Sequence, residues 1–198
     1  MKGDVTGVIL VGGKSSRVGR DKAFLPICGI PMFERVLDVL GRHLENVILV
    51  GDRPERFVKY DLPVYPDLYV GSSLGGLYTG LHASVTPYIF AAPCDLPFAS
   101  AELLKYMVSL REGYDVVVPV TAGFPEPLFA LYSKNCLNPM RELLETGNFR
   151  IFDFYPRVRV RRVLETELAP LDGSGTAFLN INTLNEYEQL LREGKNNR

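Results

Sequence analysis

The sequence predicts an α/β fold whose sheet is mainly parallel, and three observations support this. Short apolar runs rich in β-branched residues alternate with stretches of helical period, which is the order of strand–helix–strand crossovers. One apolar run, at 128–132, has no helical stretch before it and is therefore expected to be antiparallel. The 198 residues, 46% of them hydrophobic, suit one domain with a sizeable core over 1–198.

The strands and helices are placed by the period of the apolar residues. We expect strands at 7–11, 47–50, 63–66, 88–92, 116–120, 128–132, 157–163 and 178–182, and helices at 31–44, 55–60, 77–84, 101–112, 135–145 and 184–193. The first helix is expected to start at Pro31, where a missing N–H is tolerated. Valine alternates with charge in 157–163, which is typical of an edge strand. Prolines and glycines make 23–31 a connector and 123–127 a turn.

Charge and composition exclude several classes of protein. A net charge of −1 and a pI near 6.2 leave no basic face for nucleic acid or for a membrane surface. No apolar run approaches the roughly 18 residues of a membrane span, and the N-terminus does not resemble a secretory leader. We therefore expect a cytoplasmic protein with no nucleic-acid and no membrane partner.

Cysteine and histidine spacing gives no metal or disulfide framework. The three cysteines, Cys28, Cys94 and Cys136, are widely spaced and include no C-x-x-C pair, so we expect buried thiols. The two histidines, His43 and His82, have no metal-ligand spacing with each other or with a cysteine. Both are expected on helices and are given no functional role.

The segment 7–22 combines the pattern of a buried strand with a glycine pair and a concentration of positive charge. Gly12 and Gly13 allow a sharp turn and let backbone N–H groups approach a ligand closely. Four cations against one anion, Asp21, give a local charge of +3 that suits an oligophosphate; the cations are Lys14, Arg17, Arg20 and Lys22. A P-loop would need glycine in place of Val8, and adjacent glycines exclude the GxGxxG fingerprint. A solvated turn that carries cations remains the alternative.

Two carboxylates come at the ends of predicted strands. Asp67 follows the third strand and precedes a glycine- and serine-rich cluster, 71–76, that opens the next helix. Asp95 lies between Pro93 and Pro97 directly after the fourth strand. In open α/β sheets ligands bind beyond the carboxyl ends of the strands. Asp95 is therefore the expected position of a metal ligand.

Two further groups of polar residues lie late in the chain. Asn180 and Asn182 alternate with apolar residues, so on a strand they would share one face and would need partners or a ligand. We interpret them as contacts to a second substrate, with a structural network as the alternative. Arg157, Arg159 and Arg161 could reach a phosphate of that substrate or could form a solvated edge, and the sequence does not decide between the two.

The string L-V-G-G-x-S-x-R-x-G-x-D-K at 10–22 resembles the signature loop of the molybdenum cofactor guanylyltransferases. The resemblance extends over most of the chain through Asp67, Cys94-Asp95-Leu96-Pro97-Phe98, Glu126-Pro127-Leu128 with 130–132, and 178–183. It implies a Rossmann-like three-layer α/β sandwich of the nucleotide-diphospho-sugar transferase type, in which a mainly parallel sheet includes one antiparallel strand. Val11, Val18, the pair Ser72-Ser73 and Leu184 depart from the family pattern, and none of these departures removes a charged group.

The resemblance also implies an activity and a set of site residues. The family transfers GMP from GTP to the terminal phosphate of molybdopterin or its molybdenum form and releases pyrophosphate, with Mg²⁺ as cofactor. By position, the nucleotide would contact Leu10, Val11, Gly12, Gly13, Lys22, Asp52, Asp67 and Asp95. Arg17 and Lys22 would hold the triphosphate, and Asp95 would hold Mg²⁺. Asp52 stands where the family usually has asparagine, and both Asp52 and Asp67 could instead be helix caps.

Two other functions stay open at this point. A related nucleotidyltransferase could use CTP with the same pterin, or a sugar 1-phosphate as acceptor. A non-catalytic GTP-binding assembly protein could keep the loop without transferring a nucleotide, but the presence of Lys22 and Asp95 favours the enzyme. Other molybdenum cofactor biosynthesis proteins are the expected protein partners.

Overall fold

The computed structural model describes residues 2–12, 22–173, 175–179, 181 and 186–189. A central sheet has the strand order β10-β7-β9-β6-β1-β4-β5, and β8 pairs with β7 at the side of this path. Its strands are β1 (Val5–Leu10), β4 (Asn46–Val50), β5 (Val64–Tyr65), β6 (Tyr88–Pro93), β7 (Val116–Thr121), β8 (Phe124–Pro125), β9 (Ala130–Ser133) and β10 (Val160–Val163). A separate hairpin joins β2 (Pro26–Ile27) to β3 (Ile30–Pro31).

The sheet is mainly parallel, as expected. β1 pairs in parallel with β4 and β6, so that Val8 lies opposite Ile48 on one side and Ala91 on the other. β9 pairs antiparallel with both β6 and β7, which confirms the prediction for the run without a preceding helix. β10 pairs in parallel with β7 at the end of the sheet, as predicted for an edge strand. The expected turn at 123–127 includes β8, which forms an antiparallel hairpin with β7.

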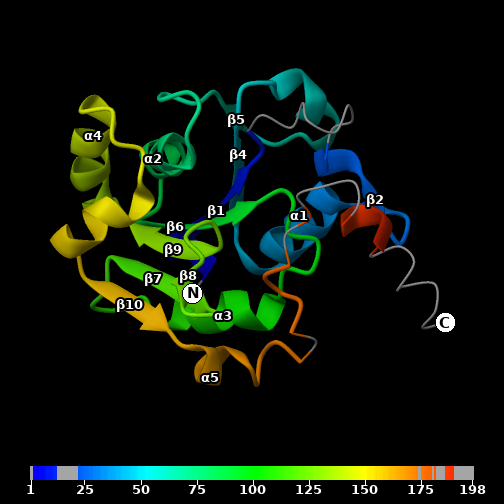
Figure 1. Cartoon of the computed structure of the whole chain (residues 1–198). Coiled ribbons are helices and arrows are strands. Elements are labelled where there is room, and N and C mark those ends of the chain that lie inside the picture. The colour runs from blue at the N-terminus through cyan, green and yellow to red at the C-terminus, as the bar shows by residue number, and fades with distance from the viewer. Residues whose placement is uncertain (1, 13–21, 174, 180, 182–185, 190–198) are drawn as a thin grey trace.

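Helices cover both faces of the sheet and complete three layers (Figure 1). α2 (Ser73–Ala83) and α4 (Leu137–Glu145) pack together on one face, and α1 (Met32–His43) packs with α3 (Ala101–Ser109) on the other. The fifth α-helix, α5 (Glu165–Leu168), is joined to α3 by a hydrogen bond from Tyr106 to Glu167. The 3-10 helices are η1 (Lys2–Asp4), η3 (Lys22–Phe24), η4 (Pro54–Tyr60), η5 (Lys134–Cys136) and η6 (Ile151–Arg157).

The core lies on both sides of the central strands, where the apolar runs predicted it. Val8, Ile9, Phe90 and Leu131 are fully buried. α2 approaches β1 closely because Gly80 has no side chain: a Cβ at this position would lie 2.6 Å from Val8 Cγ1. Burial of apolar surface of this kind is the main favourable contribution to the stability of the fold. The packing of α2 on β1 also fixes the end of β1, where the candidate site begins.

Two helix starts differ from the prediction for local reasons. α2 begins at Ser73 rather than at 77, because the Ser72 hydroxyl accepts a hydrogen bond from the Gly75 N–H (3.0 Å) and caps the helix earlier. Gly75 and Gly76, which were expected before the start of this helix, therefore lie inside it. Pro31 is the residue before α1 rather than its first residue, and it pairs with Pro26 in the β2–β3 hairpin.

The predicted strand at 178–182 is wrong for the residues that the structure describes there. Phe178, Leu179 and Ile181 are not in a strand. The segment is instead attached to another strand end, because the Ile181 N–H donates to the Asp95 carbonyl at 3.4 Å. Asn180 and Asn182 lie outside the described residues, so their shared face stays a prediction. Of the helix expected at 184–193, residues 186–189 are described and are helical.

The cysteines differ in burial. Cys136 is buried, Cys94 is half-buried, and Cys28 is exposed at the tip of the β2–β3 hairpin, so the expectation of buried thiols is wrong for Cys28. His43 and His82 lie on α1 and α2, as expected. Over the described ranges, no helix has the length and apolar character needed to cross a membrane.

Candidate active site at the carboxyl edge of the sheet

Four strand ends meet at one edge of the sheet. β1, β4, β5 and β6 are parallel, so their carboxyl ends lie side by side. The chain passes from β1 to β4 and β5 on one side of β1, and then returns through α2 to β6 on the other side. The strand order thus reverses beside β1, and ligands of open α/β sheets bind at such a switch point. The predicted nucleotide contacts at Leu10, Asp52, Asp67 and Asp95 are brought to this edge.

The backbone beyond β1 is fixed to both neighbouring strands. The Val11 N–H donates to the Val50 carbonyl at 2.8 Å, and the Leu10 carbonyl accepts from the Cys94 N–H at 3.2 Å. Gly12, which follows, is exposed. These two hydrogen bonds therefore fix the backbone of Leu10 and Val11 directly before Gly12. Gly13, Arg17 and the other residues of 13–21 lie outside the described residues, and their predicted roles stay predictions.

Gly51 is a site residue that the sequence analysis missed. A Cβ at Gly51 would lie 2.8 Å from the Gly12 backbone nitrogen and 2.9 Å from Val11 Cγ2, which is closer than such atoms pack. The absence of a side chain lets the end of β4 touch the backbone at Val11 and Gly12, where the chain leaves β1. Its only signal in the sequence is its position directly after an apolar strand and before Asp52.

Asp67 lies against two glycines, Gly12 after β1 and Gly76 on α2. A Cβ at Gly12 would lie 3.2 Å from Asp67 Oδ2, and one at Gly76 on α2 would lie 3.5 Å from Oδ1. Burial and, to a smaller extent, the neighbouring charge of Asp52 raise the pKa of the Asp67 carboxyl from 3.8 to about 6. Oδ1 is buried and has no hydrogen-bond partner among the described residues. A buried acceptor without a partner is rare, so a ligand O–H or N–H is its expected donor.

Asp95 lies half-buried in the turn that follows β6, as the two flanking prolines suggested. Its carbonyl accepts the hydrogen bond from the Ile181 N–H, which brings Ile181 to the same turn. Lys22 is the first residue of η3, directly after the undescribed part of the loop. The two residues Ala23 and Leu25, which follow in this segment, are buried and anchor it in the core.

The donor set at this edge fits a hard, phosphate-bound cation. No cluster of three or more His, Cys, Asp or Glu side chains that could hold a metal occurs in the described part of the chain. Mg²⁺ takes one or two carboxylates and completes its octahedron with phosphate oxygens and water. A single carboxylate such as Asp95 at a strand end fits that requirement.

The arginines of the predicted edge strand do not lie at the site. Arg157 forms an ion pair with Glu142 at 2.8 Å, and Arg161 pairs with Glu167. Arg159 pairs with Asp115, which directly precedes β7 and so lies at the amino edge of the sheet, opposite the candidate site. Arg157 lies in η6 rather than in the strand, and none of the three ion pairs involves a residue of the candidate site.

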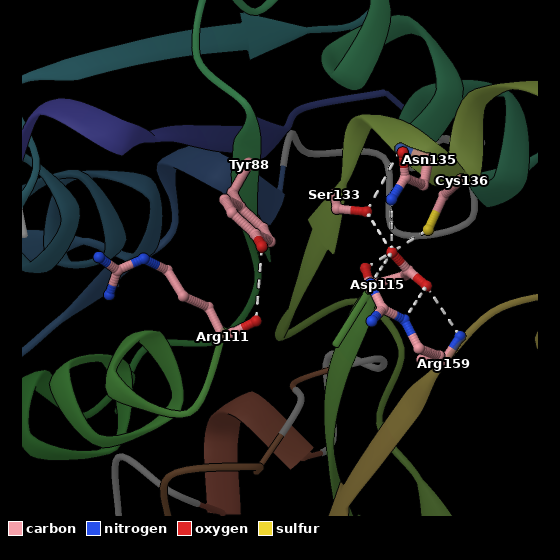
Figure 2. Close-up of polar contacts among 7 residues, drawn as sticks. All are labelled: Tyr88, Arg111, Asp115, Ser133, Asn135, Cys136 and Arg159. Atoms are coloured by element: carbon pink, nitrogen blue, oxygen red, sulfur yellow. Dashed lines mark hydrogen bonds and ion pairs between the residues drawn. The ribbon is translucent and has the colours of Figure 1, made fainter. Parts of the chain in front are cut away.

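Asp115 is the centre of a polar network at that amino edge (Figure 2). It is 5% exposed and accepts hydrogen bonds from the Arg159 backbone (2.9 Å), Arg159 Nε (3.2 Å), Asn135 Nδ2 (2.7 Å) and Ser133 Oγ (3.2 Å). Burial alone would raise the pKa of the Asp115 carboxyl, but these donors outweigh it and hold the pKa at about 2. The network ties β7, β9 and the approach to β10 together, which is a structural role.

Residues 7–161 match the family model of the MobA-like NTP transferase domain. The chain belongs to this family. A relative from Pelotomaculum thermopropionicum named "Probable molybdenum cofactor guanylyltransferase" is 42% identical over 182 residues, which cover 90% of this chain and 87% of the relative. A protein of the same name from Natranaerobius thermophilus is 36% identical over 196 residues, which cover 96% of each chain. As a member of the family, the chain is a nucleotidyltransferase.

Solved structures show the same fold. Molybdopterin-guanine dinucleotide biosynthesis protein A from Archaeoglobus fulgidus superposes with a TM-score of 0.82 at 24% identity, over 96% of this chain and 99% of that one. A protein from Aquifex aeolicus superposes with a TM-score of 0.76 at 30% identity, over 92% of this chain and 96% of that one. The mixed, mainly parallel sheet is thus the nucleotide-diphospho-sugar transferase type of fold that the sequence resemblance implied.

Proposed function

We propose that this nucleotidyltransferase transfers GMP from GTP to the terminal phosphate of molybdopterin or its molybdenum form, producing molybdopterin guanine dinucleotide and pyrophosphate. The names of the relatives at 42% and 36% identity support this choice of substrates. The observation that carries the proposal is the arrangement of Gly12 and Asp67 at the switch point. The backbone at Gly12 is close-packed and suits a phosphate. It lies against Asp67, whose buried Oδ1 has no partner among the described residues.

The reaction brings two phosphates together. An oxygen of the pterin phosphate attacks the α-phosphorus of GTP, the new P–O bond forms, and the bond to the β-phosphate oxygen breaks and releases pyrophosphate. The attacking oxygen is already an anion, so no strong general base is required. Two unit charges about 4 Å apart repel by about 4 kcal/mol at an effective dielectric constant of roughly 20. Catalysis therefore consists mainly of positioning and of offsetting negative charge.

The residues at the carboxyl edge divide this work. Backbone N–H groups of Gly12 and Gly13 bind phosphate oxygens, and Arg17 and Lys22 hold the triphosphate and stabilise the departing pyrophosphate. Asp95 would hold Mg²⁺, which supplies positive charge to the phosphate oxygens when bound. Asp67 accepts a hydrogen bond from the nucleoside, and Asp52 contributes to the same contact. Asn180 and Asn182 contact the pterin substrate, which the bond between Ile181 and the Asp95 carbonyl supports.

Labelled GTP tests the proposed transfer directly. The protein is incubated with molybdopterin, Mg²⁺ and GTP carrying ³²P at either the α- or the γ-position. We expect the α-label in the pterin dinucleotide and the γ-label in pyrophosphate. Lys22→Ala is the matched control and should lower both yields by on the order of a hundredfold. Appearance of the γ-label as free phosphate, with no labelled dinucleotide, would indicate GTP hydrolysis and would contradict the proposal.

A further inference from the structure

β10 forms one end of the central sheet (Figure 1), and a groove of about 420 Å³ lies between this strand, β8 and η6. Small-molecule sites in proteins have volumes of roughly 300–1,000 Å³ and are lined mainly by apolar and aromatic side chains with a few polar groups. This groove has that composition. Its apolar lining includes Pro125, Phe152, Tyr155, Pro156 and Val160, and its charged residue is Arg162. None of them belongs to the candidate active site.

The aromatic wall of the groove is held in place by its own contacts. Tyr155 is 5% exposed, and its ring packs edge-to-face against Phe154 (centroids 5.0 Å apart) and Phe152 (5.5 Å). Its hydroxyl oxygen lies 3.4 Å from that of Tyr132 on β9, which donates to the Pro127 carbonyl at 2.6 Å. Phe152 is 43% exposed and leaves apolar surface in contact with water. A ligand that covers this surface would gain hydrophobic binding energy without having to order the wall.

The alternation of side chains along β10 places one arginine in the groove. Val160 and Arg162 are two residues apart and both line it. Arg161, between them, points to the opposite face of the strand and pairs with Glu167 beside α3. The strand therefore presents an apolar residue and a cation side by side to the groove.

Arg162 differs from the three other arginines of 157–162. Arg157, Arg159 and Arg161 each form an ion pair with a carboxylate. The Arg162 guanidinium has no ion pair or hydrogen bond within the described residues, and no acidic residue lines the groove. A guanidinium group presents a planar fork of N–H donors that matches a carboxylate. The charge of Arg162 is therefore available to an anion bound in the groove.

We propose that this groove binds a small amphipathic monoanion, in which an apolar or aromatic body carries one carboxylate. The body lies against Phe152, Pro156 and Val160, and the carboxylate pairs with Arg162. A single cation matches a single negative charge, which favours a carboxylate over a phosphate dianion. The inference does not rest on the proposed transfer reaction, because no residue of the groove is assigned to GTP, metal or acceptor.

The size and charge of the groove favour a small molecule over a protein as its occupant. A standard protein interface involves about 20–30 residues on each side, whereas seven residues line this groove. A two-fold contact with a second copy of the chain would bring the same patch of both copies together. It would then place one Arg162 near the other, and the two like charges would repel.

The test uses phenylbutyrate as the probe, with phenylbutanol and phenylbutylamine as analogues that keep the body and change the head group. Each compound is titrated into the whole protein while the backbone amide shifts are followed by NMR. We expect phenylbutyrate to shift amides of 152–162 with a dissociation constant on the order of 1 mM, as suits a ligand of about a dozen non-hydrogen atoms. Phenylbutanol should bind roughly fivefold to tenfold more weakly because it lacks the charge-assisted hydrogen bonds, and the amine more weakly still.

Arg162→Gln and Arg161→Gln form a matched pair on β10. Arg162→Gln should bring the dissociation constants of the acid and the alcohol to within about twofold of each other and leave that of the alcohol unchanged, because only the charge is lost. Arg161→Gln should keep the preference of the wild type for the acid, since its side chain lies on the other face. The amide spectrum of each variant shows whether its fold is retained.

Several outcomes would overturn the inference. The first is equal affinity of the wild type for the acid and the alcohol, and the second is the same loss of preference in both variants. Shifts confined to the carboxyl edge would place the ligand in the candidate active site instead. Shifts of 152–162 that depend on protein concentration without ligand would indicate a second copy as the occupant. If a variant does not fold, the comparison of acid, alcohol and amine on the wild type decides alone.

Discussion

Asp67 is the side chain of the candidate site whose surroundings are defined most fully. Its carboxylate lies against Gly12 and Gly76, close enough to Asp52 for the two charges to interact, and one oxygen is buried without a described partner. Such an arrangement disfavours the charged form in the absence of a ligand. A hydrogen-bond donor of a bound nucleotide would remove that penalty. In the free protein, the ionised Asp67 lowers the free energy of unfolding.

Asp67→Asn should stabilise the free protein at high pH and weaken nucleotide binding. The folded pKa of about 6 exceeds the ordinary value of 3.8, so ionisation of Asp67 opposes folding. The penalty is absent well below pH 4, grows as the pH rises to about 6 and is complete above it. We expect a gain of on the order of 1 kcal/mol at pH 8, after allowance for solvent screening, and little gain at pH 4.

The measurement is urea unfolding of Asp67→Asn and wild type at both pH values, together with GTP titration at pH 8. Asp61→Asn, the same change at an exposed position, is measured beside it as the control. Equal stabilisation at pH 4 and pH 8 would show that ionisation of Asp67 is not what opposes folding.

At the scale of elements, the backbone at the end of β4 lies close to the backbone at the end of β1, at Gly51 and Gly12. The contact depends on Gly51, which has no space for a Cβ beside the Gly12 nitrogen. The hydrogen bond from Val11 to Val50 and the one from Gly51 to Tyr65 (3.0 Å) hold β1, β4 and β5 in this register. The position of Val11 and Gly12 is therefore a consequence of how three strands end.

Gly51→Ala should damage both stability and nucleotide binding. The added methyl group would meet backbone and Val11 Cγ2 within 3 Å, and relief of such overpacking costs about 1–3 kcal/mol. Because the relief must move Gly12, we also expect KM for GTP to rise by roughly tenfold or more. Gly41→Ala on α1 is the control: no atom lies within 4 Å of its Cβ position, and alanine should stabilise the helix by up to about 1 kcal/mol. Thermal unfolding and GTP kinetics of both variants decide, and a harmless Gly51→Ala would contradict the close contact.

The sequence predicted the elements that repeat a clear pattern and missed contacts between distant segments. The period of the apolar residues located the central strands and the antiparallel run, because both faces of these strands are buried. The start of α2 was placed late because Gly75 and Gly76 suggest a loop, whereas the cap by Ser72 makes them helical. The alternation at 178–182 suggested a strand, but Ile181 bonds to the turn at Asp95 instead. Gly51 gave no signal, since its close contact with Val11 and Gly12 depends on neighbours far away in the chain.

At the scale of the whole molecule, the two edges of the sheet have different tasks. The carboxyl edge carries the candidate site, where the surroundings of Asp67 disfavour its charged form and raise its pKa to about 6. The amino edge carries the satisfied network around Asp115, which joins β7, β9 and Arg159 (Figure 2). Buried and hydrogen-bonded charge of this kind stabilises a fold only when all partners are present.

Asp115→Asn should therefore lower stability and leave the chemistry unchanged. The folded pKa of about 2 lies below the ordinary 3.8, so this carboxylate contributes stability above about pH 4 that is lost as the pH falls toward 2. Replacing a charged acceptor by an amide should cost about 1–3 kcal/mol at pH 7. Urea unfolding and kcat are measured on the same preparation. A large fall in kcat without loss of stability would show that the two edges are not separate.

The ratio of kcat/KM for GTP and CTP, measured with molybdopterin as acceptor and Mg²⁺ present, tests most directly whether the nucleotide is GTP. Gly13 and Asp21-Lys22 are of the guanylyl type by resemblance, and a site that accepts hydrogen bonds from guanine leaves its acceptors unpaired when cytosine enters. Each unpaired buried group costs about 1–3 kcal/mol, so two predict a preference for GTP of roughly a hundredfold or more. Equal values, or a preference for CTP, would contradict the claim.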